Sequence, residues 1–378
     1  MKYKMIAVVG LNTQELAIIR LFNKAGYKVY CFEDPIEHKF GAYRHSKYIN
    51  SKNCIFYRDN NEFVNKLKCI ADKYSKEEVL LVLAYPTGVT TLRAEHPELW
   101  AQYDVISGPL DVINMLGIKD KCYDFFKSCG LSSKKYMLLS DYKQGSITFP
   151  VILKRNLERR DLEAKYKCVK LDTEVELEAF IKTVPVELYE CLILQECIED
   201  DFIDIDWRGY VHHGDVKGCA LVKELRTYPE GIPCYLEEIS DKVICCNITT
   251  YMRNILKPLD YTGFIGIDIK YRESDKTVYV LDVNPRIPAS VSSWLLKYDE
   301  SELIEFFKRI DNPPVLKTGK YIRWTNIARD IQARKKKKDY SGIWKTLTAK
   351  KDVFSWSDPL PFILNVSFTI IKLLTGRL

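Results

Sequence analysis

The sequence predicts a mixed α/β (α+β) protein of 378 residues, and three kinds of stretch support this. Near the N-terminus, an apolar run at 5–9, a helical pattern at 14–24 and an apolar run at 27–32 are typical of a β-α-β unit. A short apolar run at 79–84 indicates a further buried strand. Between 264 and 284, two arms rich in β-branched and aromatic residues flank a polar turn, which predicts a hairpin.

Length and composition are those of a globular protein with two or three domains, because 47% of residues are hydrophobic and 29% charged. The net charge of +6 suits anionic partners such as nucleotides or phospholipid headgroups, and it is weak evidence for nucleic acid. Twelve cysteines form no CxxC pair, and the opening Met1–Lys4 leads into a short strand rather than a signal peptide. We therefore expect reduced thiols in a cytoplasmic protein. No stretch reaches the 18 or so apolar residues that a membrane span needs.

Residues 1–108 are predicted to form a small open α/β domain. Gly10 follows the first strand alone, and the absence of GxGxxG disfavours dinucleotide binding. A helical pattern at 61–73 precedes the buried strand at 79–84. The chain then breaks at Ser107-Gly108-Pro109. A purely structural role is the favoured interpretation of this domain.

The next region, 109–190, carries two cationic signals. Helical patterns cover 111–116 and 120–128, and Lys119 and Lys121 stand at the start of the second helix, where an anion is favoured. The apolar strand Phe149–Arg155 ends in Lys154, which either points to solvent or is held over phosphate oxygens. An amphipathic helix is predicted at 174–183.

From 191 onward, strands and loops alternate. The apolar strand Leu192–Ile198 breaks into an acidic run, and its free backbone groups could meet a flat heterocycle such as adenine. A hairpin is predicted over 206–223. Lys223 and Arg226 lead a Pro/Gly-bounded loop that either clamps an anion or is a solvated turn. Two further helices are predicted, at 240–256 and 300–310.

The hairpin at 264–284 places Asp268 opposite Asp282 when it is folded about Asp275. Strict alternation puts Val278, Val280, Asp282 and Asn284 on one face. Two carboxylates set against each other repel, and a divalent cation would convert that repulsion into a binding site. Arg286 can then meet an anion bidentately. The alternative interpretation is an exposed hairpin with solvated charges.

Five motifs, taken in chain order, carry a resemblance to a known family. They are Lys121, Lys154, Q-E-x-I at Gln195–Ile198, Asp268, and D-x-N-P-R at Asp282–Arg286. The set resembles the ATP-grasp superfamily over about residues 1–310. LDVNPR followed by Ala289-Ser290 is closest to the version in carbamoyl phosphate synthetase and biotin carboxylase. Overall the chain is most similar to ATP-grasp carboxylate–amine ligases, including the D-aspartate ligase type.

The resemblance implies a domain order as well as a fold. It implies an ATP-grasp fold with a Rossmann-like pre-ATP-grasp domain at 1–108, a small lid subdomain at 109–190 and a subdomain with the metal site at 191–310. A basic, partly amphipathic helical tail at 311–378 would follow.

The nucleotide would be ATP, and the resemblance implies which residues hold it. Lys121 and Lys154 would contact its α- and β-phosphates, while Gln195, Glu196 and Ile198 would lie at the adenine. The family has an acidic residue for the ribose about seven places after the Glu, but Ile203 stands there, so Asp204 or Asp201 takes that role.

The metal and catalytic residues follow from the same resemblance. Asp268, Asp282 and Asn284 would hold Mg²⁺, with Mn²⁺ as the alternative ion; the family often has Glu where Asp282 stands. Arg286 would steady the transferred phosphate, and Lys223 and Arg226 match a basic substrate-side loop.

The implied activity is an ATP-dependent carboxylate–amine ligase acting on small molecules through an acyl-phosphate. Two alternatives stay open: an ATP-grasp carboxylase or carbamoyl-phosphate-type enzyme, and a non-catalytic nucleotide-binding regulatory protein. No nucleophilic Ser or Cys is required, so the cysteines and five histidines are expected to be ordinary packing or surface residues.

The tail combines a basic run at Arg334–Lys338 with an apolar stretch at 362–374, within which Asn365, Thr369 and Lys372 would line one stripe of a helix. Such a helix could lie on an anionic membrane through 334–374, at the inner face, near a lipid-linked glycan or envelope precursor. The alternatives are a helix docked on the protein or in a homodimer interface. No nucleic-acid partner is expected.

Overall fold

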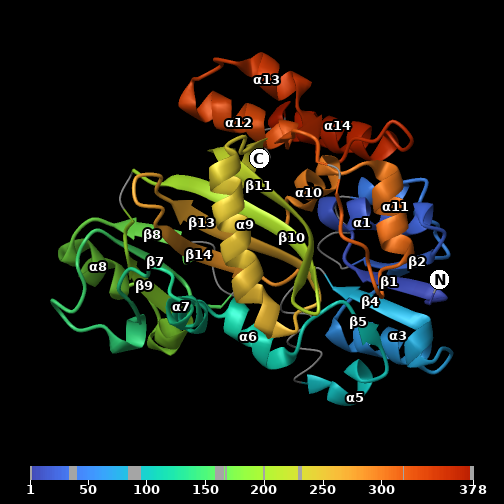
Figure 1. The fold of residues 1–378 in the computed structure, drawn as a ribbon, viewed down its shortest axis with the longest axis horizontal. Coiled ribbons are helices and arrows are strands. Elements are labelled where there is room, and N and C mark those ends of the chain that lie inside the picture. Colours follow the sequence, from blue (N-terminus) through green and yellow to red (C-terminus); the bar gives the residue numbers. More distant parts are fainter. Residues whose placement is uncertain are drawn as a thin grey trace. The chain divides into compact units, whose positions relative to one another are not determined.

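The structure is a computed structural model (Figure 1). It describes residues 2–33, 41–83, 95–157, 166, 168–198, 201–228, 232–317 and 319–374. Contacts divide the chain into two compact units, each of which is built from separate segments. Unit 1 contains Met1–Gly108, Arg208–Ile265 and Arg286–Leu378, and unit 2 contains Pro109–Trp207 and Gly266–Pro285. The mixed α/β prediction is confirmed.

The N-terminal part of unit 1 is a parallel sheet in the order β3-β2-β1-β4-β5. The strands are β1 Met5–Val9, β2 Lys28–Glu33, β3 Cys54–Phe56, β4 Val79–Leu83 and β5 Asp104–Val105. The helices are α1 Thr13–Lys24, α3 Asn60–Ala71 and the short α5 Pro97–Trp100.

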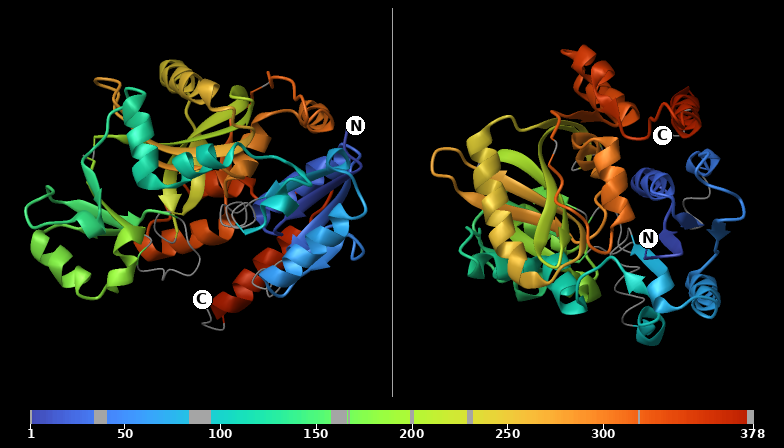
Figure 2. Two further views of the ribbon diagram at one scale, coloured as in Figure 1. Left: turned by 90° about the horizontal axis from the view of Figure 1, so that it is seen from below. Right: turned by 45° about the vertical axis from the view of Figure 1, so that its right-hand side comes forward.

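Helices α1 and α3 lie on opposite faces of this sheet (Figure 2). Successive residues of β2 point to opposite faces, so Cys31 joins the cluster around α1 whereas Phe32 stacks edge-on against Phe63 of α3. The start of α1 is fixed by a capping box, in which Asn12 and Glu15 satisfy each other's backbone N–H groups.

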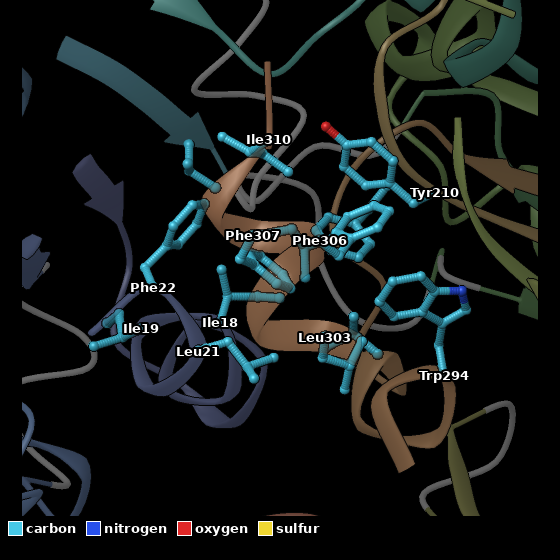
Figure 3. Close-up of a cluster of buried hydrophobic side chains, with 14 of the residues drawn as sticks. Ile18, Ile19, Leu21, Phe22, Tyr210, Trp294, Leu303, Phe306, Phe307 and Ile310 are labelled. Atoms are coloured by element: carbon cyan, nitrogen blue, oxygen red, sulfur yellow. The ribbon is translucent and has the colours of Figure 1, made fainter. Parts of the chain in front are cut away.

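The main core of unit 1 forms where α1 meets α11, Glu300–Lys308 (Figure 3). Phe22 and Phe307 make an edge-to-face contact with ring centroids 4.8 Å apart, and Tyr210 packs against Phe306. These rings join the parallel sheet to strands that come from the C-terminal half of the sequence.

A seven-stranded sheet has the order β14-β13-β10-β11-β12-β15-β16, and β10 and β13 run from one unit into the other. Its strands are β10 Ile203–His212, β11 Asp215–Thr227, β12 Pro233–Glu238, β13 Gly263–Tyr271, β14 Val278–Asn284, β15 Arg323–Thr325 and β16 Lys350–Lys351. Two helices accompany it in unit 1, α9 Lys242–Leu256 and α10 Val291–Lys297. Asp241 caps α9 by accepting from the N–H groups of Val243 and Ile244.

Residues 311–374 contain more regular structure than the sequence analysis predicted. Strands β15 and β16 join the seven-stranded sheet, and the helices are α12 Ile327–Lys337, α13 Ile343–Thr348 and α14 Leu360–Leu374. The carboxylate of Asp330, fully buried on α12, accepts hydrogen bonds from Arg226, Arg334 and Thr346. This network ties α12 and α13 to β11.

Unit 2 contains a four-stranded antiparallel sheet in the order β6-β9-β7-β8. Its strands are β6 Tyr136–Leu138, β7 Val151–Arg155, β8 Cys168–Leu171 and β9 Leu192–Glu196, and its helices are α6 Leu110–Gly117, α7 Lys119–Ser128 and α8 Glu174–Ile181. Alternate residues of these strands, including Val151, Leu153 and Leu194, form a core with Leu177 of α8. The other face of the sheet therefore carries Ile152, Lys154 and Gln195.

Candidate nucleotide and metal site

The candidate site lies in unit 2, where α7, β7, β9 and β14 meet. Asn156, just after β7, fixes the start of α7: its carbonyl accepts from the N–H of Lys119 at 2.9 Å and its Oδ1 from the N–H of Asp120 at 3.0 Å. The Asn156 amide also donates to the Asp120 carboxylate at 3.0 Å. Residues at the end of β7 and at the start of α7 are thereby held together.

Lys154 lies half-buried between the four-stranded sheet and β14. Its ammonium donates to Gln195 Oε1 at 2.9 Å and approaches the carbonyl oxygen of Leu281 at 3.4 Å. It also lies 5.3 Å from the ring centroid of Tyr123. Burial, followed by the nearby charge of Lys119, lowers the pKa of Lys154 to about 8. A half-buried ammonium whose direct hydrogen-bond partners are neutral oxygens is electrostatically prepared for an anion.

Lys119 and Asp282 form the charged pair beside Lys154. Lys119 Nζ donates to Asp282 Oδ1 at 2.6 Å, and the Asp282 side chain stays about one third exposed. Asp282 partly offsets the lowering of the pKa of Lys154. The cluster therefore brings two ammonium groups and at least one carboxylate together at the end of β14.

The predicted pairing of the two hairpin carboxylates is confirmed, since Asp268 on β13 lies opposite Asp282 on β14. The prediction that Val278, Val280, Asp282 and Asn284 share one face is wrong. The register shifts between Asp268 and Ile269, because a bulge at Leu281 adds a residue to β14 and reverses the alternation. Val278, Val280 and Val283 are buried, whereas Asp282 and Asn284 share the more open face with Asp268.

The bulge also accounts for the position of the Leu281 carbonyl. That oxygen accepts from Tyr123 OH at 2.7 Å and faces Lys154 Nζ at 3.4 Å. Burial, and then the charge of Asp282, raise the pKa of Tyr123 well above its ordinary value, so the phenol remains a hydrogen-bond donor.

Sequence reasoning chose Lys121 for the phosphates, but the structure places Lys121 on the exposed side of α7 and brings Lys119 to Asp282. The buried face of α7 contains Cys122, Tyr123 and Phe126. Lys119 precedes Tyr123 by four residues and is on that face, whereas Lys121 is on the other side of the helix. This periodicity was the signal that could have separated the two lysines.

At the end of β9, the strand predicted to meet adenine is partly engaged in its own sheet. The N–H of Glu196 donates to the carbonyl of Lys135 at 3.0 Å, and the N–H of Cys197 donates to Pro150 at 2.9 Å. Glu196 Oε1 accepts from the N–H of Thr148 at 3.1 Å. Ile198 lies two residues beyond the end of β9 and is half-buried.

The two acidic residues proposed for the ribose, Asp204 and Asp201, form ion pairs with basic residues of the hairpin at 264–284. Asp204 Oδ1 lies 2.9 Å from Lys270 Nζ, and Asp201 lies 3.4 Å from Arg272. Lys270 shares the face of Asp268, two residues along β13, so Asp204 borders the metal-side face.

Three predicted catalytic residues belong to unit 1. The Arg286 guanidinium donates to the carbonyl of Ile287 at 3.3 Å, and Lys223 is exposed opposite Glu237 on β12. Arg226 contacts Asp330 and stacks over Tyr235 at 4.2 Å. Its charge is therefore matched by a buried carboxylate. Residues 229–231 of the predicted loop lie outside the described residues.

The donor set fits Mg²⁺, because Asp268 and Asp282 supply carboxylate oxygens on one face and Asn284 an amide oxygen. Within the described part of the chain, no group of three or more His, Cys, Asp or Glu side chains is placed to hold a metal. Two carboxylates are nevertheless the usual number for Mg²⁺ that is shared with nucleotide phosphates.

Comparison with solved structures gives matches over most of the chain. An L-amino acid ligase from Bacillus licheniformis matches with a TM-score of 0.61 and 14% identity, covering 83% of this chain and 75% of that one. N5-carboxyaminoimidazole synthetase from Staphylococcus aureus, complexed with ADP, matches with a TM-score of 0.66 and 14% identity, covering 89% and 86%.

The biotin carboxylase domain of Hydrogenobacter thermophilus 2-oxoglutarate carboxylase, a dimer in complex with MgADP and bicarbonate, matches with a TM-score of 0.63 and 14% identity, covering 84% and 72%. This chain has the ATP-grasp fold. No protein-family model and no curated protein matches the sequence. The assignment of the ATP-grasp fold therefore comes from the three-dimensional arrangement of the chain.

Proposed function

We propose that this ATP-grasp protein is an ATP- and Mg²⁺-dependent ligase that activates a carboxylate as an acyl-phosphate and joins it to an amine. The observation that carries the proposal is the cluster of Lys119, Lys154 and Asp282, in which the half-buried ammonium of Lys154 has a pKa of about 8 and faces neutral oxygens. Such an arrangement suits polyphosphate, because anionic oxygens can accept from the Lys154 ammonium, whose described hydrogen-bond partners are neutral oxygens.

Each candidate site residue in unit 2 has a defined role in this proposal. Lys154 and Lys119 hold phosphate oxygens, and Lys119 takes the part that sequence reasoning gave to Lys121. Asp268, Asp282 and Asn284 hold Mg²⁺, or Mn²⁺ in its place, and the bound ion would neutralise charge on the phosphates. Gln195 orients Lys154, the end of β9 receives the adenine, and Asp204 remains the ribose candidate.

The chemistry of the proposed reaction balances without a protein nucleophile. A substrate carboxylate oxygen attacks the terminal phosphorus of ATP, and ADP leaves. An amine then attacks the acyl carbon, phosphate leaves, and the amine loses a proton. The protein positions the groups and stabilises the transferring phosphoryl charge. Arg286 is proposed to steady that group and Lys223 to meet substrate. Arg226 is left out of the chemistry because Asp330 already pairs with it.

The test is ADP and phosphate release with ATP and Mg²⁺ over a panel of amino acids and acidic sugars, together with calorimetric binding of ADP. Asp282→Ala is the blank, and Asp275→Asn in the turn of the same hairpin is the matched control, since Asp275 pairs only locally with Arg272 and Thr277. Substrate-dependent release that Asp282→Ala loses and Asp275→Asn keeps supports the proposal. ADP binding without release over the whole panel would instead assign a non-catalytic nucleotide-binding role.

A carboxylase is the second candidate, favoured by the likeness to a biotin carboxylase domain whose structure contains bicarbonate. Bicarbonate is therefore included in the panel as a carboxylate. If ADP release required bicarbonate and did not depend on any amine of the panel, the protein would be a carboxylase.

We place the ligase in the cytoplasm at the inner face of the membrane, with a cell-envelope or glycan precursor as one substrate. Among the described residues, no helix is long and apolar enough to cross a bilayer. The support for a membrane location is the surface of the C-terminal helices.

A further inference from the structure

We propose that the C-terminal surface of unit 1, formed by the last turn of α12 together with α13 and α14, docks on an anionic lipid bilayer. These three helices follow one another in the chain and lie along one side of unit 1 (Figures 1 and 2). The proposal rests on the side chains of this surface and is independent of the reaction that unit 2 performs.

The first observation is a set of large apolar side chains that are open to solvent. Trp356, just before α14, is 89% exposed, and Trp344 on α13 is 75% exposed. On α14, Leu360, Ile363 and Phe368 are each between 41% and 52% exposed. At 3.6 residues per turn these three positions fall on one half of the helix. Exposed tryptophans beside aliphatic side chains are typical of the bilayer–water interface.

The second observation is that α14 is held rigidly at its start, so its exposed side has a fixed orientation. The buried carboxylate of Asp358 accepts from Arg20 Nε at 2.9 Å, from Ser46 Oγ at 2.5 Å and from the N–H of Lys47 at 3.0 Å. Arg20 also donates to the carbonyl of Val353 at 2.8 Å. The other side of α14 packs against residues 43–45 of the N-terminal part of unit 1.

The third observation is a positive charge beside the apolar residues. Six lysines on or next to α12 and α13 are exposed: Lys335, Lys336, Lys337, Lys338, Lys345 and Lys350. Between 331 and 378 the sequence has ten basic residues and three acidic ones, Asp339, Asp352 and Asp358. Asp352 and Asp358 are buried, so their carboxylates contribute little exposed negative charge.

Together these features favour an anionic bilayer over other partners. A symmetric dimer through this surface would bring the same lysines of two copies together, which like-charge repulsion disfavours. Nucleic acid would use the lysines but gains little from exposed Leu360 and Ile363. An anionic bilayer would bind both kinds of side chain, because its headgroups attract the lysines and the boundary with the acyl chains accepts the apolar side chains. With 15 residues, α14 is about 22 Å long, so it would lie in the interface rather than span it.

The experiment is flotation of the full-length protein with vesicles of phosphatidylcholine alone or with one quarter phosphatidylglycerol, at about 0.1 M and 0.5 M salt. We expect binding only to the anionic vesicles, weakened at the higher salt. Lys335→Glu/Lys336→Glu should weaken binding by about tenfold or more, since each lysine near an anionic surface contributes about 1 kcal/mol. Ile363→Glu/Phe368→Glu should also weaken it by about tenfold or more, because carboxylates replace apolar groups that enter the interface.

Matched controls carry the same changes elsewhere. Lys73→Glu/Lys143→Glu and Val175→Glu/Val186→Glu change exposed residues outside this surface and should bind like wild type. Equal partition into neutral and anionic vesicles overturns the proposal, as does an apolar double variant that binds like wild type. Self-association without vesicle binding, lost in Ile363→Glu/Phe368→Glu, would assign the surface to a second copy of the chain. Salt-sensitive RNA binding without vesicle binding would assign it to nucleic acid.

Discussion

In unit 2 the half-buried ammonium of Lys154 faces the side-chain oxygen of Gln195, the carbonyl of Leu281 and a tyrosine ring, whereas in unit 1 the buried guanidinium of Arg334 lies against the carboxylate of Asp330. Arg334 is almost fully buried, and burial is the main cause of the lowered pKa of Lys154. Among the residues that the structure describes, a negative charge is in direct contact with Arg334 but not with Lys154. The charge of Asp282 reaches Lys154 through space, while its carboxylate hydrogen-bonds with Lys119.

Under the proposed function, this difference distinguishes a structural cation, Arg334, from a cation that binds a ligand, Lys154. A buried ion pair costs stability when one partner is removed, because the other charge is left uncompensated. A buried lysine without a matched anion instead lowers the stability of the protein, and its pKa falls. A bound anionic ligand would offset this loss of stability. Unit 2 is therefore the stronger candidate for a catalytic site.

The largest expected effect tests Lys154 directly. Lys154→Met should reduce the ligase activity by about 10²-fold or more, because a preorganised charge at the transferring group is lost. The midpoint of thermal unfolding should stay the same or rise, since a buried charge without a matched partner is replaced by an apolar chain of similar length. Steady-state ADP release and differential scanning calorimetry measure the two effects.

The control for this change is Lys170→Met on the neighbouring strand β8, where the ammonium pairs with Asp172 at 2.8 Å in solvent. Neither activity nor the unfolding midpoint should change appreciably. If Lys154→Met unfolded the protein while retaining activity per folded molecule, Lys154 would be a structural cation and the comparison between the units would fail.

The converse change in unit 1 should alter stability rather than activity. Arg226→Met removes one partner of the fully buried Asp330, and the free energy of unfolding should fall by about 3 kcal/mol. Urea unfolding measures this change, and ADP release per folded molecule should remain near wild type. Lys223→Met on the same strand is the control for stability alone, because Lys223 is exposed and is itself proposed to meet substrate. A stable Arg226→Met variant with reduced activity would instead support the predicted role of Arg226 in binding substrate.

The sequence was most informative where local pattern alone decides the structure. The hairpin signal of 264–284 is confirmed to the residue at the Asp268–Asp282 pair, because a short polar turn between β-branched arms sets the register. The bulge at Leu281 was not predictable, since nothing in alternating Val278 and Val280 signals an extra residue.

Other misses came from tertiary contacts that link distant segments. Asn156 and Lys119 are 37 positions apart, and the hydrogen bond between them exists only in the folded chain. Arg226 carried the same local signal as a phosphate-binding arginine. Asp330, more than one hundred positions further on, decides that its charge is already paired.

The altered pKa of Lys154 should make the proposed nucleotide binding dependent on pH. Burial and Lys119 lower this pKa from 10.5 to about 8, so between these values the unfolded chain binds more protons than the folded one. The lysine therefore destabilises the free protein fully below pH 8, and that penalty declines as the pH rises toward 10.5. Phosphate oxygens favour the charged ammonium, so ADP binding at pH 8 should take up about half a proton.

Calorimetry of ADP binding at pH 8, in two buffers with different ionisation enthalpies, measures this uptake. The apparent enthalpy should differ between the buffers for wild type and agree between them for Lys154→Met. ADP affinity should also decrease as the pH is raised above 8. Agreement between the buffers for wild type would mean that the nucleotide does not contact Lys154.

The smallest expected effect concerns the ribose, for which Asp204 is the candidate. Asp204→Asn should weaken ADP binding by about fivefold, the loss expected when one hydrogen bond worth about 1 kcal/mol is impaired. Asp201→Asn is the matched control, because Asp201 also forms an ion pair on this hairpin, with Arg272 in place of Lys270. Surface ion pairs of this kind contribute little, so the control should leave both affinity and stability unchanged. If Asp201→Asn weakened ADP binding and Asp204→Asn did not, the ribose would lie near Asp201. The nucleotide would then extend further beyond the end of β9 than the positions of Lys154 and Gln195 suggest.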